Sequence, residues 1–385
     1  TIRIGLSVIL MLVLVYVILN RRLLKYGSDY LANNYPVKNV IVMVPDGCSN
    51  SLQTLARWKK GEPLTLDSIL VGAVKTYMTN SVITGSAAAA TAFATGYKTT
   101  PGFLSVGPRT EDVLSGLEIP REGIEYRPLA TALEGAKLYG KSTGLVATST
   151  VCHATPAGFA SHIHDRNMYN EITEQIVYQN IDVVFGGGKQ YLFPLHEGGK
   201  RTDGENLLNV LREKGYQIVK TKEEMKAITS GKVWGLFAND HMDADLNRRT
   251  FRLDQPSLAE MTAKAIELLS QDKNGFFLMV EGSQIDWAGH DNDPVYMVTE
   301  FLAFDEAVKV AVDFARKDER TLILVFSDHN TGGLTIGSRT TDIPYNETTI
   351  EDLIVPLKRM KVTAGVVTRN IGSDHSYSNV SKEIS

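Results

Sequence analysis

Short apolar segments recur along the chain, and most are apolar at every position instead of at alternate positions. This pattern is typical of β-strands buried on both faces of a parallel sheet. It occurs at residues 40–44, 144–147, 183–185, 276–280 and 321–326. Segments with helical patterns lie between them, at residues 127–139, 204–214, 257–270 and 295–316. The alternation predicts an α/β fold with a doubly wound, mostly parallel central sheet and helices on both faces.

The two ends of the chain differ from this pattern. Residues 4–19 are almost wholly apolar and are followed by a basic cluster at residues 20–25. Their length lies between a signal-peptide core and a full membrane span, so residues 1–25 are expected to be a signal or a membrane anchor. Without a small-residue cleavage pattern downstream, the uncleaved anchor is favoured. We expect residues 36–385 to form a single domain, with residues 373–385 as a surface segment.

Composition narrows the class of protein. The chain has 385 residues, 43% hydrophobic and 22% charged, which is typical of a globular protein. A net charge of -4 provides no basic surface, so a nucleic-acid polymer is not an expected partner. The two cysteines, Cys48 and Cys152, imply no disulfide framework. We expect two buried, unpaired thiols, although both lie near candidate site residues and so can also lie close together.

Metal-ligand residue types follow four of the predicted strands. They are Asp46, His153 with Thr155, Glu281, and Asp328 with His329. Ligands of open α/β sheets bind outside the carboxyl ends of the strands, so these side chains are expected to converge.

A second feature of this kind is the segment 281–290, which holds two carboxylates and an imidazole. Asp286 and His290 stand four residues apart, so on a helix both face one way, as two ligands of one zinc ion must. Glu281 is a hard oxygen ligand that suits a neighbouring magnesium ion. The alternative is an ordinary polar loop after a strand. The pattern predicts a metal site.

A candidate nucleophile lies in the alanine-rich segment at residues 84–96. Four alanines after Ser86 favour a helix that has this serine in its first turn. The N-terminus of a helix binds anions such as phosphate, and a serine hydroxyl there can attack phosphorus. The alternative is that Ser86 only caps the helix.

Together these motifs resemble those of the alkaline phosphatases, from about residue 40 to residue 333. The matching residues, in the family's order, are Asp46-Gly47, Ser86-Ala87-Ala88, Ala154-Thr155-Pro156 with Arg166, the set Glu281, Asp286 and His290, and Asp328-His329-Asn330-Thr331-Gly332-Gly333. Each motif alone is weak to moderate evidence, but five in one order are specific.

The resemblance implies two Zn²⁺ and one Mg²⁺. One zinc would be held by Asp46, Asp328, His329 and the Ser86 oxygen, the second by Asp286 and His290, and the magnesium by Asp46, Thr155 and Glu281. Arg166 would bind two phosphate oxygens through its planar guanidinium. His153 would lie beside the magnesium ligands and the phosphate, or be a satisfied core or surface histidine. Trp287 would shape the phosphate pocket or merely pack.

The implied activity is metal-dependent hydrolysis of phosphate monoesters through a phosphoserine on Ser86. Small phosphorylated metabolites are the implied substrates, and the resemblance allows a homodimer. The implied location is extracytoplasmic, in the periplasm or at the cell surface, with membrane association through residues 4–19. The alternatives are a phosphodiesterase on the same metal scaffold, and a catalytically weak, membrane-tethered metal- or phosphate-binding protein.

The sequence departs from the family pattern at three places. Gly85 stands where many members have an aspartate that orients the arginine, so phosphate is expected to be held more loosely. Asn330 replaces a common glutamate beside the metal ligands, with little expected consequence. The family's third protein ligand to the second zinc is a later histidine; His375 is the one histidine after residue 333 and is a poor match. We therefore expect that ligand to lie beyond residue 385.

Overall fold

The computed structural model describes residues 37–111, 113–117, 123–337, 344 and 346–384. The predicted signal or anchor segment, residues 1–25, lies outside the described residues. Within these ranges, no helix combines the length and the apolar character that crossing a membrane requires. The prediction that residues 36–385 form one domain stays a prediction.

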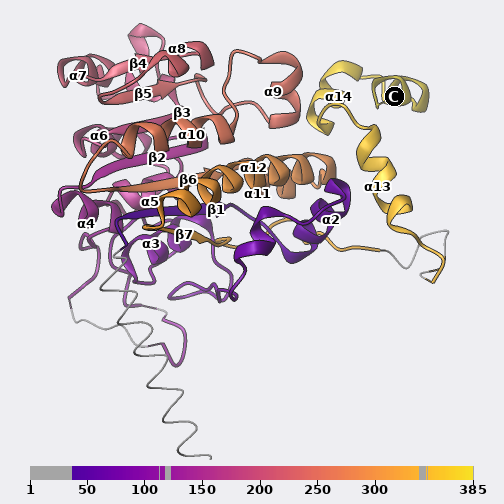
Figure 1. The fold of residues 1–385 in the computed structure, drawn as a ribbon, viewed down its shortest axis with the longest axis horizontal. Helices are drawn as coiled ribbons and strands as arrows, with labels where there is room; N and C mark the ends of the chain where they lie inside the picture. Colours follow the sequence, from indigo (N-terminus) through magenta and orange to yellow (C-terminus); the bar gives the residue numbers. More distant parts are fainter. Residues whose placement is uncertain (1–36, 112, 118–122, 338–343, 345, 385) are drawn as a thin grey trace, which may run out of the picture.

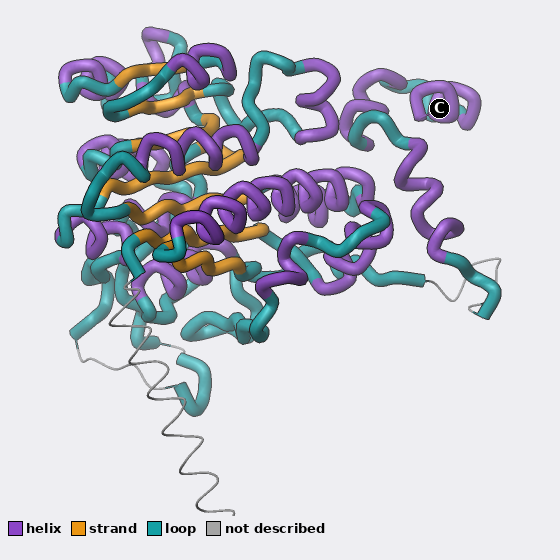
Figure 2. The backbone as a smooth tube through the Cα atoms, in the orientation of Figure 1, coloured by secondary structure: helices purple, strands orange, loops and turns teal. Residues whose placement is uncertain are grey.

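A seven-stranded parallel sheet forms the centre of the protein (Figures 1 and 2). The strands are β1 (Asn39–Pro45), β2 (Ser142–Thr150), β3 (Val183–Gly187), β4 (Gln217–Val219), β5 (Val233–Leu236), β6 (Phe276–Gly282) and β7 (Thr321–Val325). Their order across the sheet is β4-β5-β3-β2-β6-β1-β7, and every neighbouring pair is parallel. The helices occupy the connections between strands, so the predicted α/β class is confirmed.

Fourteen α-helices occur in the described residues. They are α2 (Asn50–Lys60), α3 (Ser86–Thr95), α4 (Ala132–Leu138), α5 (Ala154–Ala160), α6 (Tyr169–Tyr178), α7 (Leu207–Glu213), α8 (Lys222–Ala227), α9 (Asp245–Phe251), α10 (Leu258–Leu269), α11 (Gln284–His290), α12 (Pro294–Asp318), α13 (Ile350–Arg359), α14 (Ala364–Ile371) and α15 (Tyr377–Ile384). The four helices that the sequence predicts correspond to α4, α7, α10 and α12.

Two hydrophobic cores lie on opposite faces of the sheet because side chains alternate along each strand. In β1, Ile41 and Met43 pack on the face covered by α2, α10 and α12, whereas Val42 and Val44 pack against α3 to α7. Cys48 belongs to the first core and Cys152 to the second. Both thiols are buried and unpaired, as predicted, and burial raises the pKa of Cys48 to about 12 and that of Cys152 to about 11.

One strand is less buried than predicted. The segment 321–326 was expected to be covered on both faces, but Leu322 is 41% exposed and Leu324 is 38% exposed. The reason is that β7 is the last strand of the sheet and, among the described strands, pairs only with β1. Its alternating burial is the pattern of an edge strand with one covered face.

The C-terminal region contains three helices that the sequence analysis does not predict. Helix α13 begins at a capping box in which Thr349 and Asp352 each accept a hydrogen bond from the other's backbone. Together α13, α14 and α15 form the end of the chain beside α2 and α9 (Figure 1). The segment 373–385, expected as a surface excursion, includes the whole of α15.

Candidate active site

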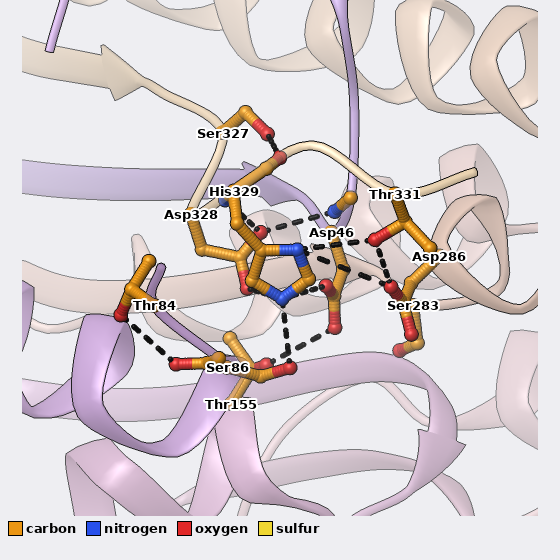
Figure 3. Close-up of polar contacts among 12 residues, drawn as sticks. Asp46, Thr84, Ser86, Thr155, Ser283, Asp286, Ser327, Asp328, His329 and Thr331 are labelled. Atoms are coloured by element: carbon orange, nitrogen blue, oxygen red, sulfur yellow. Dashed lines mark hydrogen bonds and ion pairs between the residues drawn. The ribbon is translucent and has the colours of Figure 1, made fainter. Parts of the chain in front are cut away.

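The carboxyl ends of β1, β6 and β7 carry the central residues of the site. Strand β1 lies between the other two, with Val44 opposite Glu281. Asp46 follows β1 directly, and its backbone N–H donates to the Gly282 carbonyl at 3.2 Å. After β7, the Asp328 carboxylate accepts a hydrogen bond from the Gly47 N–H at 3.0 Å. The side chains that follow these strands therefore converge, as predicted (Figure 3).

Gly47 explains why an Asp-Gly pair follows the first strand. Its φ is +72°, a conformation that residues with a side chain rarely adopt. A Cβ atom at this position would lie 2.8 Å from the Asp286 Cα, which is closer than packing allows. The glycine thus lets the loop after β1 approach α11, and this approach brings Asp46 and Asp286 together.

Four carboxylates, those of Asp46, Glu281, Asp286 and Asp328, form a buried group that we call the strand-end cluster. The described part of the chain brings only histidines, His290 and His329, within ion-pair distance of it. Burial, followed by the charge of Asp328, raises the pKa of Asp46 well above its ordinary value. Burial also raises the pKa of Glu281 to about 7. The cluster therefore lacks positive charge of its own.

This donor set fits divalent metal ions. One oxygen on each of Asp46, Glu281 and Asp328 is buried and has no hydrogen-bond partner among the described residues. Ligand atoms of Asp46, Asp286 and His329 all lie within 4.8 Å of one another. Carboxylate oxygens and imidazole nitrogens are ligands of zinc, and all-oxygen sets suit magnesium. A bound cation would supply the partners that the buried oxygens lack.

His329 lies at the centre of the group (Figure 3). Its Nε2 atom is 3.4 Å from Asp46 Oδ1, 3.3 Å from Asp328 Oδ2 and 3.3 Å from Ser86 Oγ. Its Nδ1 atom lies 3.1 Å from Thr331 Oγ1, whose hydroxyl also bonds Asp286. The imidazole thus contacts residues of both predicted zinc sets. Thr331 is a contact that the sequence analysis does not predict, although it lies in the last matched motif.

Ser86 is the first residue of α3 and is buried. The N-cap of the helix is Gly85, which has no side chain to cap it, so the alternative in which Ser86 serves as the capping residue is wrong. Two kinds of group remain at this helix end: the backbone N–H groups of the first turn, which have no partner within the helix, and the hydroxyl of Ser86, which lies 3.3 Å from His329 Nε2. Both suit an incoming anion.

Glu281 and Thr155 lie deeper than the serine. One Glu281 oxygen accepts hydrogen bonds from Ser149 Oγ at 3.2 Å and Ser283 Oγ at 2.5 Å, which leaves the second oxygen unpartnered. Thr155, in the first turn of α5, donates to Asp46 Oδ2 at 3.5 Å. The predicted magnesium ligands Thr155 and Asp46 are thus in contact. Ser149 and Ser283 were not predicted, because serines next to a strand end are too common to single out.

A cavity of about 560 Å³ opens above the serine. Its lining includes Ser86, His153, Arg166, Asp286 and His329. The structure therefore brings the candidate nucleophile and the candidate phosphate-binding arginine to one cavity. His290 also lines it, but its side chain is 70% exposed and, at 3.5 Å, contacts only Asp286 in the strand-end cluster. His375 is exposed between α14 and α15.

Arg166 is positioned by a histidine and not by a carboxylate. Its Nη2 atom lies 3.2 Å from His153 Nε2, and no described carboxylate forms an ion pair with it. Burial, then the charge of Arg166, lowers the pKa of His153 to about 3. The ring is therefore neutral near pH 7 and accepts a hydrogen bond from the guanidinium.

An aromatic group adjoins this pair. The rings of His241 and Trp287 are 4.3 Å apart, and His153 lies 5.6 Å from Trp287. Trp287 also lines the cavity. His241 is a residue that sequence reasoning missed, because it lies between β5 and α9, far in sequence from every matched motif.

The chain belongs to the alkaline phosphatase family, whose sequence pattern matches residues 37–377. Alkaline phosphatase 3 of Bacillus subtilis is 40% identical over 321 residues, which cover 80% of this chain and 64% of that relative. The chain thus spans less than two thirds of the length of this curated relative. The family predicted from the motifs is confirmed.

Solved structures give the same result. Alkaline phosphatase from Thermus thermophilus superposes with a TM-score of 0.77 at 32% identity, covering 91% of this chain and 71% of that one. A variant of the alkaline phosphatase from the Antarctic bacterium TAB5, solved with magnesium bound, has a TM-score of 0.67 at 31% identity, covering 81% and 83%. The fold of this chain and its family assignment therefore both agree with these structures.

Proposed function

We propose that this protein hydrolyses phosphate monoesters to an alcohol and inorganic phosphate through a phosphoserine on Ser86. The observation that carries the proposal is the placement of one hydroxyl. Ser86 Oγ lies at the N-terminus of α3, 3.3 Å from His329 Nε2, in a cavity that Arg166 also lines. The candidate nucleophile, the anion-binding groups and the candidate metal ligands thus lie together at one cavity.

The residues divide the chemistry between them. Ser86 Oγ attacks phosphorus, and the phosphoryl group passes from the alcohol oxygen to the serine. Arg166 binds two phosphate oxygens with its planar guanidinium, and the N–H groups of α3 face the same charge. His153, neutral at pH 7, holds Arg166 through its Nε2 atom. Water then cleaves the phosphoserine and releases phosphate.

The proposed metals are two Zn²⁺ and one Mg²⁺. Asp46, Asp328 and His329 would hold one zinc together with Ser86 Oγ, Asp286 and His290 the second, and Asp46, Thr155 and Glu281 the magnesium. When bound, such ions stabilise the charge on attacking and leaving oxygens and lower the pKa of a coordinated hydroxyl. The unpartnered carboxylate oxygens support this assignment, as does magnesium in the TAB5 relative.

We further propose small phosphorylated metabolites as substrates and an extracytoplasmic location, the latter from the apolar residues 4–19. A homodimer is supported by exposed apolar side chains in the loop before α3, namely those of Leu70, Val71, Val82 and Ile83. Light scattering of the folded protein would test the dimer. A monomer at micromolar concentration would exclude it.

The phosphoserine is the decisive test. The zinc- and magnesium-loaded protein is incubated with ³²P-labelled phosphate at mildly acidic pH, quenched with acid and digested. We expect the label on the peptide that contains Ser86 and none on the Ser86→Ala variant. Absence of label from a fully loaded preparation would favour a protein that binds metal or phosphate without turnover.

A second measurement separates the phosphodiesterase alternative. Hydrolysis of 4-nitrophenyl phosphate, bis(4-nitrophenyl) phosphate and 4-nitrophenyl sulfate is compared under identical metal loading. The proposal expects kcat/KM for the monoester to exceed that for the diester and the sulfate by at least about a thousandfold, roughly 4 kcal/mol in the barrier. A preference for the diester would overturn it.

A further inference from the structure

A second cavity, of about 550 Å³, lies next to the first and shares Arg166 with it. Its other lining residues include Phe103, Arg109, Tyr126, His164 and Asp165. A volume of this size is ordinary for a small-molecule site. Because Arg166 borders both cavities, a phosphate held by this arginine has a path for the rest of its molecule into the second cavity.

Three rings form one wall of the second cavity. Phe103 lies 5.3 Å from Tyr126 and 6.3 Å from His164, and Tyr126 lies 6.1 Å from His164. Phe103 is buried, whereas Tyr126 is half exposed and lines the cavity. Aromatic walls of this kind stack planar groups.

The backbone holds this wall in place. Arg166 N donates to Gly102 O at 2.9 Å, and Leu104 and Ile163 form an antiparallel bridge. Gly107 bridges to Glu125, and a Cβ atom on Gly107 would lie only 1.9 Å from the Ile124 carbonyl oxygen. The loop that carries Tyr126 is thus tied to the segment before α6, and Tyr126 itself has a φ of +55°. Few non-glycine residues of the described chain adopt this conformation, and the bridges on either side of the loop hold Tyr126 in it.

The charges of the cavity favour an anion. The guanidinium of Arg109 lies 5.9 Å from the Phe103 ring, and within the described ranges neither Arg109 nor Arg166 forms an ion pair. One carboxylate, Asp165, opposes these two arginines, and one of its oxygens accepts a hydrogen bond from Asn167 N. Two guanidinium groups without an ion-pair partner among the described residues suit a ligand with two negative groups.

We propose that this cavity binds the leaving-group portion of the substrate and selects leaving groups that carry a planar ring and a second anionic group, as in a nucleoside 5′-diphosphate. The terminal phosphate lies at Ser86 and Arg166, the inner phosphate at Arg109, and the base stacks on Tyr126. This assignment rests on the proposed phosphoryl transfer to Ser86 and extends it to phosphoanhydrides: the bond between the terminal phosphorus and the bridging oxygen breaks, and a nucleoside monophosphate leaves in place of an alcohol.

Three substrates separate the contributions of ring and charge. ADP carries both, pyrophosphate carries the second anionic group without the ring, and methyl phosphate carries neither. The metal-loaded protein is assayed for kcat/KM on each, next to Arg109→Gln and Tyr126→Gly. Glycine suits the positive φ of position 126, so the second variant removes the ring without adding backbone strain. Arg127→Gln, an exposed arginine beside the same loop that does not line the cavity, is the matched control.

We expect Arg109→Gln to lower the ratio of kcat/KM for ADP to that for methyl phosphate by about tenfold, since a charge-assisted hydrogen bond is lost. The ratio of pyrophosphate to methyl phosphate falls with it. Tyr126→Gly lowers the ratio of ADP to pyrophosphate by about five- to tenfold, the contribution of one stacked base. Arg127→Gln changes none of these ratios. Unchanged ratios in both cavity variants would overturn the proposal.

Binding distinguishes failure of this inference from failure of the proposed function. Calorimetric titration of ADP into the metal-loaded protein is repeated with both cavity variants. If the parent protein hydrolyses none of the three substrates, the proposed function is wrong, while a loss of ADP affinity in Arg109→Gln still supports the cavity. Equal affinity in all variants would show that the cavity does not bind the nucleotide.

Discussion

Two groups of buried carboxylates in this protein differ in the charged side chains that surround them. In the strand-end cluster, four carboxylates meet without a lysine or arginine partner in the described residues. The second group, which we call the helical cluster, joins three residues of α9, namely Asp245, Arg248 and Arg249, to Glu300 of α12. There, Arg248 Nη2 lies 2.8 Å from Asp245 Oδ1, and Arg249 Nε lies 2.6 Å from Asp245 Oδ2.

The difference separates carboxylates that stabilise the fold from carboxylates that await a ligand. In the helical cluster, two arginines pair with the Asp245 carboxylate, and Glu300 accepts a hydrogen bond from the Asp245 N–H at 2.5 Å. In the strand-end cluster, three oxygens remain buried and unpartnered. Burial of unpaired charge costs several kcal/mol, so such a group persists where a bound cation offsets that cost.

The largest expected effect comes from removing one acid of the strand-end cluster. Asp46→Asn should lower kcat/KM for 4-nitrophenyl phosphate by about a thousandfold or more, because Asp46 is proposed to serve two metal ions. The metal-free variant should at the same time be more stable than the metal-free parent by about 1–3 kcal/mol, because the burial and repulsion that disfavour an ionised Asp46 are relieved. Activity assays, metal analysis and urea unfolding after chelation measure both effects. A destabilised metal-free variant would contradict the comparison.

Removing one acid of the helical cluster should have the opposite effect on the stability of the fold. Asp245→Asn leaves Arg248 partly buried without its anion, so we expect a loss of about 2–4 kcal/mol in the free energy of unfolding. Metal content and kcat/KM per folded molecule should remain those of the parent. Asp67→Asn, which breaks the more exposed pair with Arg57, is the control and should cost under about 1 kcal/mol. A loss of bound zinc in Asp245→Asn would show that the two clusters are coupled.

An effect on the free energy of unfolding that depends on pH is expected at Glu300. Burial, then the charge of Asp245, raises the pKa of Glu300 to about 8 from an ordinary value of 4.5. The folded protein therefore binds this proton more tightly than the unfolded chain. The resulting stability is complete below about pH 4.5 and is lost as the pH rises through about 8.

Glu300→Gln tests this linkage directly. Glutamine keeps the oxygen that accepts from Asp245 N–H but does not ionise, so the variant should match the parent at pH 5. At pH 9 it should be more stable by up to about 4 kcal/mol, measured by urea unfolding at both values. An equal difference at pH 5 and pH 9 would rule out ionisation of Glu300 as the cause.

The strand-end cluster was predictable from the sequence because its signals are local. An apolar run identifies each strand, and Asp46, Glu281 and Asp328 follow the runs directly. Parallel strands place their carboxyl ends at one edge, so convergence follows from the fold class alone. The family resemblance then added Arg166, whose place in space no local pattern fixes.

The helical cluster and the second cavity were not predictable in this way. Arg248 and Glu300 are 52 residues apart in sequence, and their two helices meet only through tertiary packing. Arg109 and Tyr126 lie in loops without helical or strand periodicity, and isolated backbone bridges bring these loops together. Strands β4 and β5 were missed for a related reason: at three and four residues, they are too short for a period to show.

The smallest expected effect concerns Arg166, which has no carboxylate partner among the described residues and so resembles neither arginine of the helical cluster. Gly85 lines the same cavity, and open space surrounds the position that its Cβ would occupy. Gly85→Asp would provide Arg166 with an anion that orients the guanidinium, so the inhibition constant for inorganic phosphate should fall about three- to fivefold.

Two opposing consequences of this substitution have to be separated. Position 85 is the N-cap of α3, so aspartate there also caps the helix, and its charge repels phosphate. Gly85→Asn caps equally well without the charge and is the matched control. Tighter inhibition by phosphate in the aspartate variant alone would assign the effect to Arg166, because capping is common to both variants and repulsion acts in the other direction. Weaker inhibition in the aspartate variant would mean that repulsion exceeds orientation, and that the pairing found in the helical cluster cannot be transferred to this arginine.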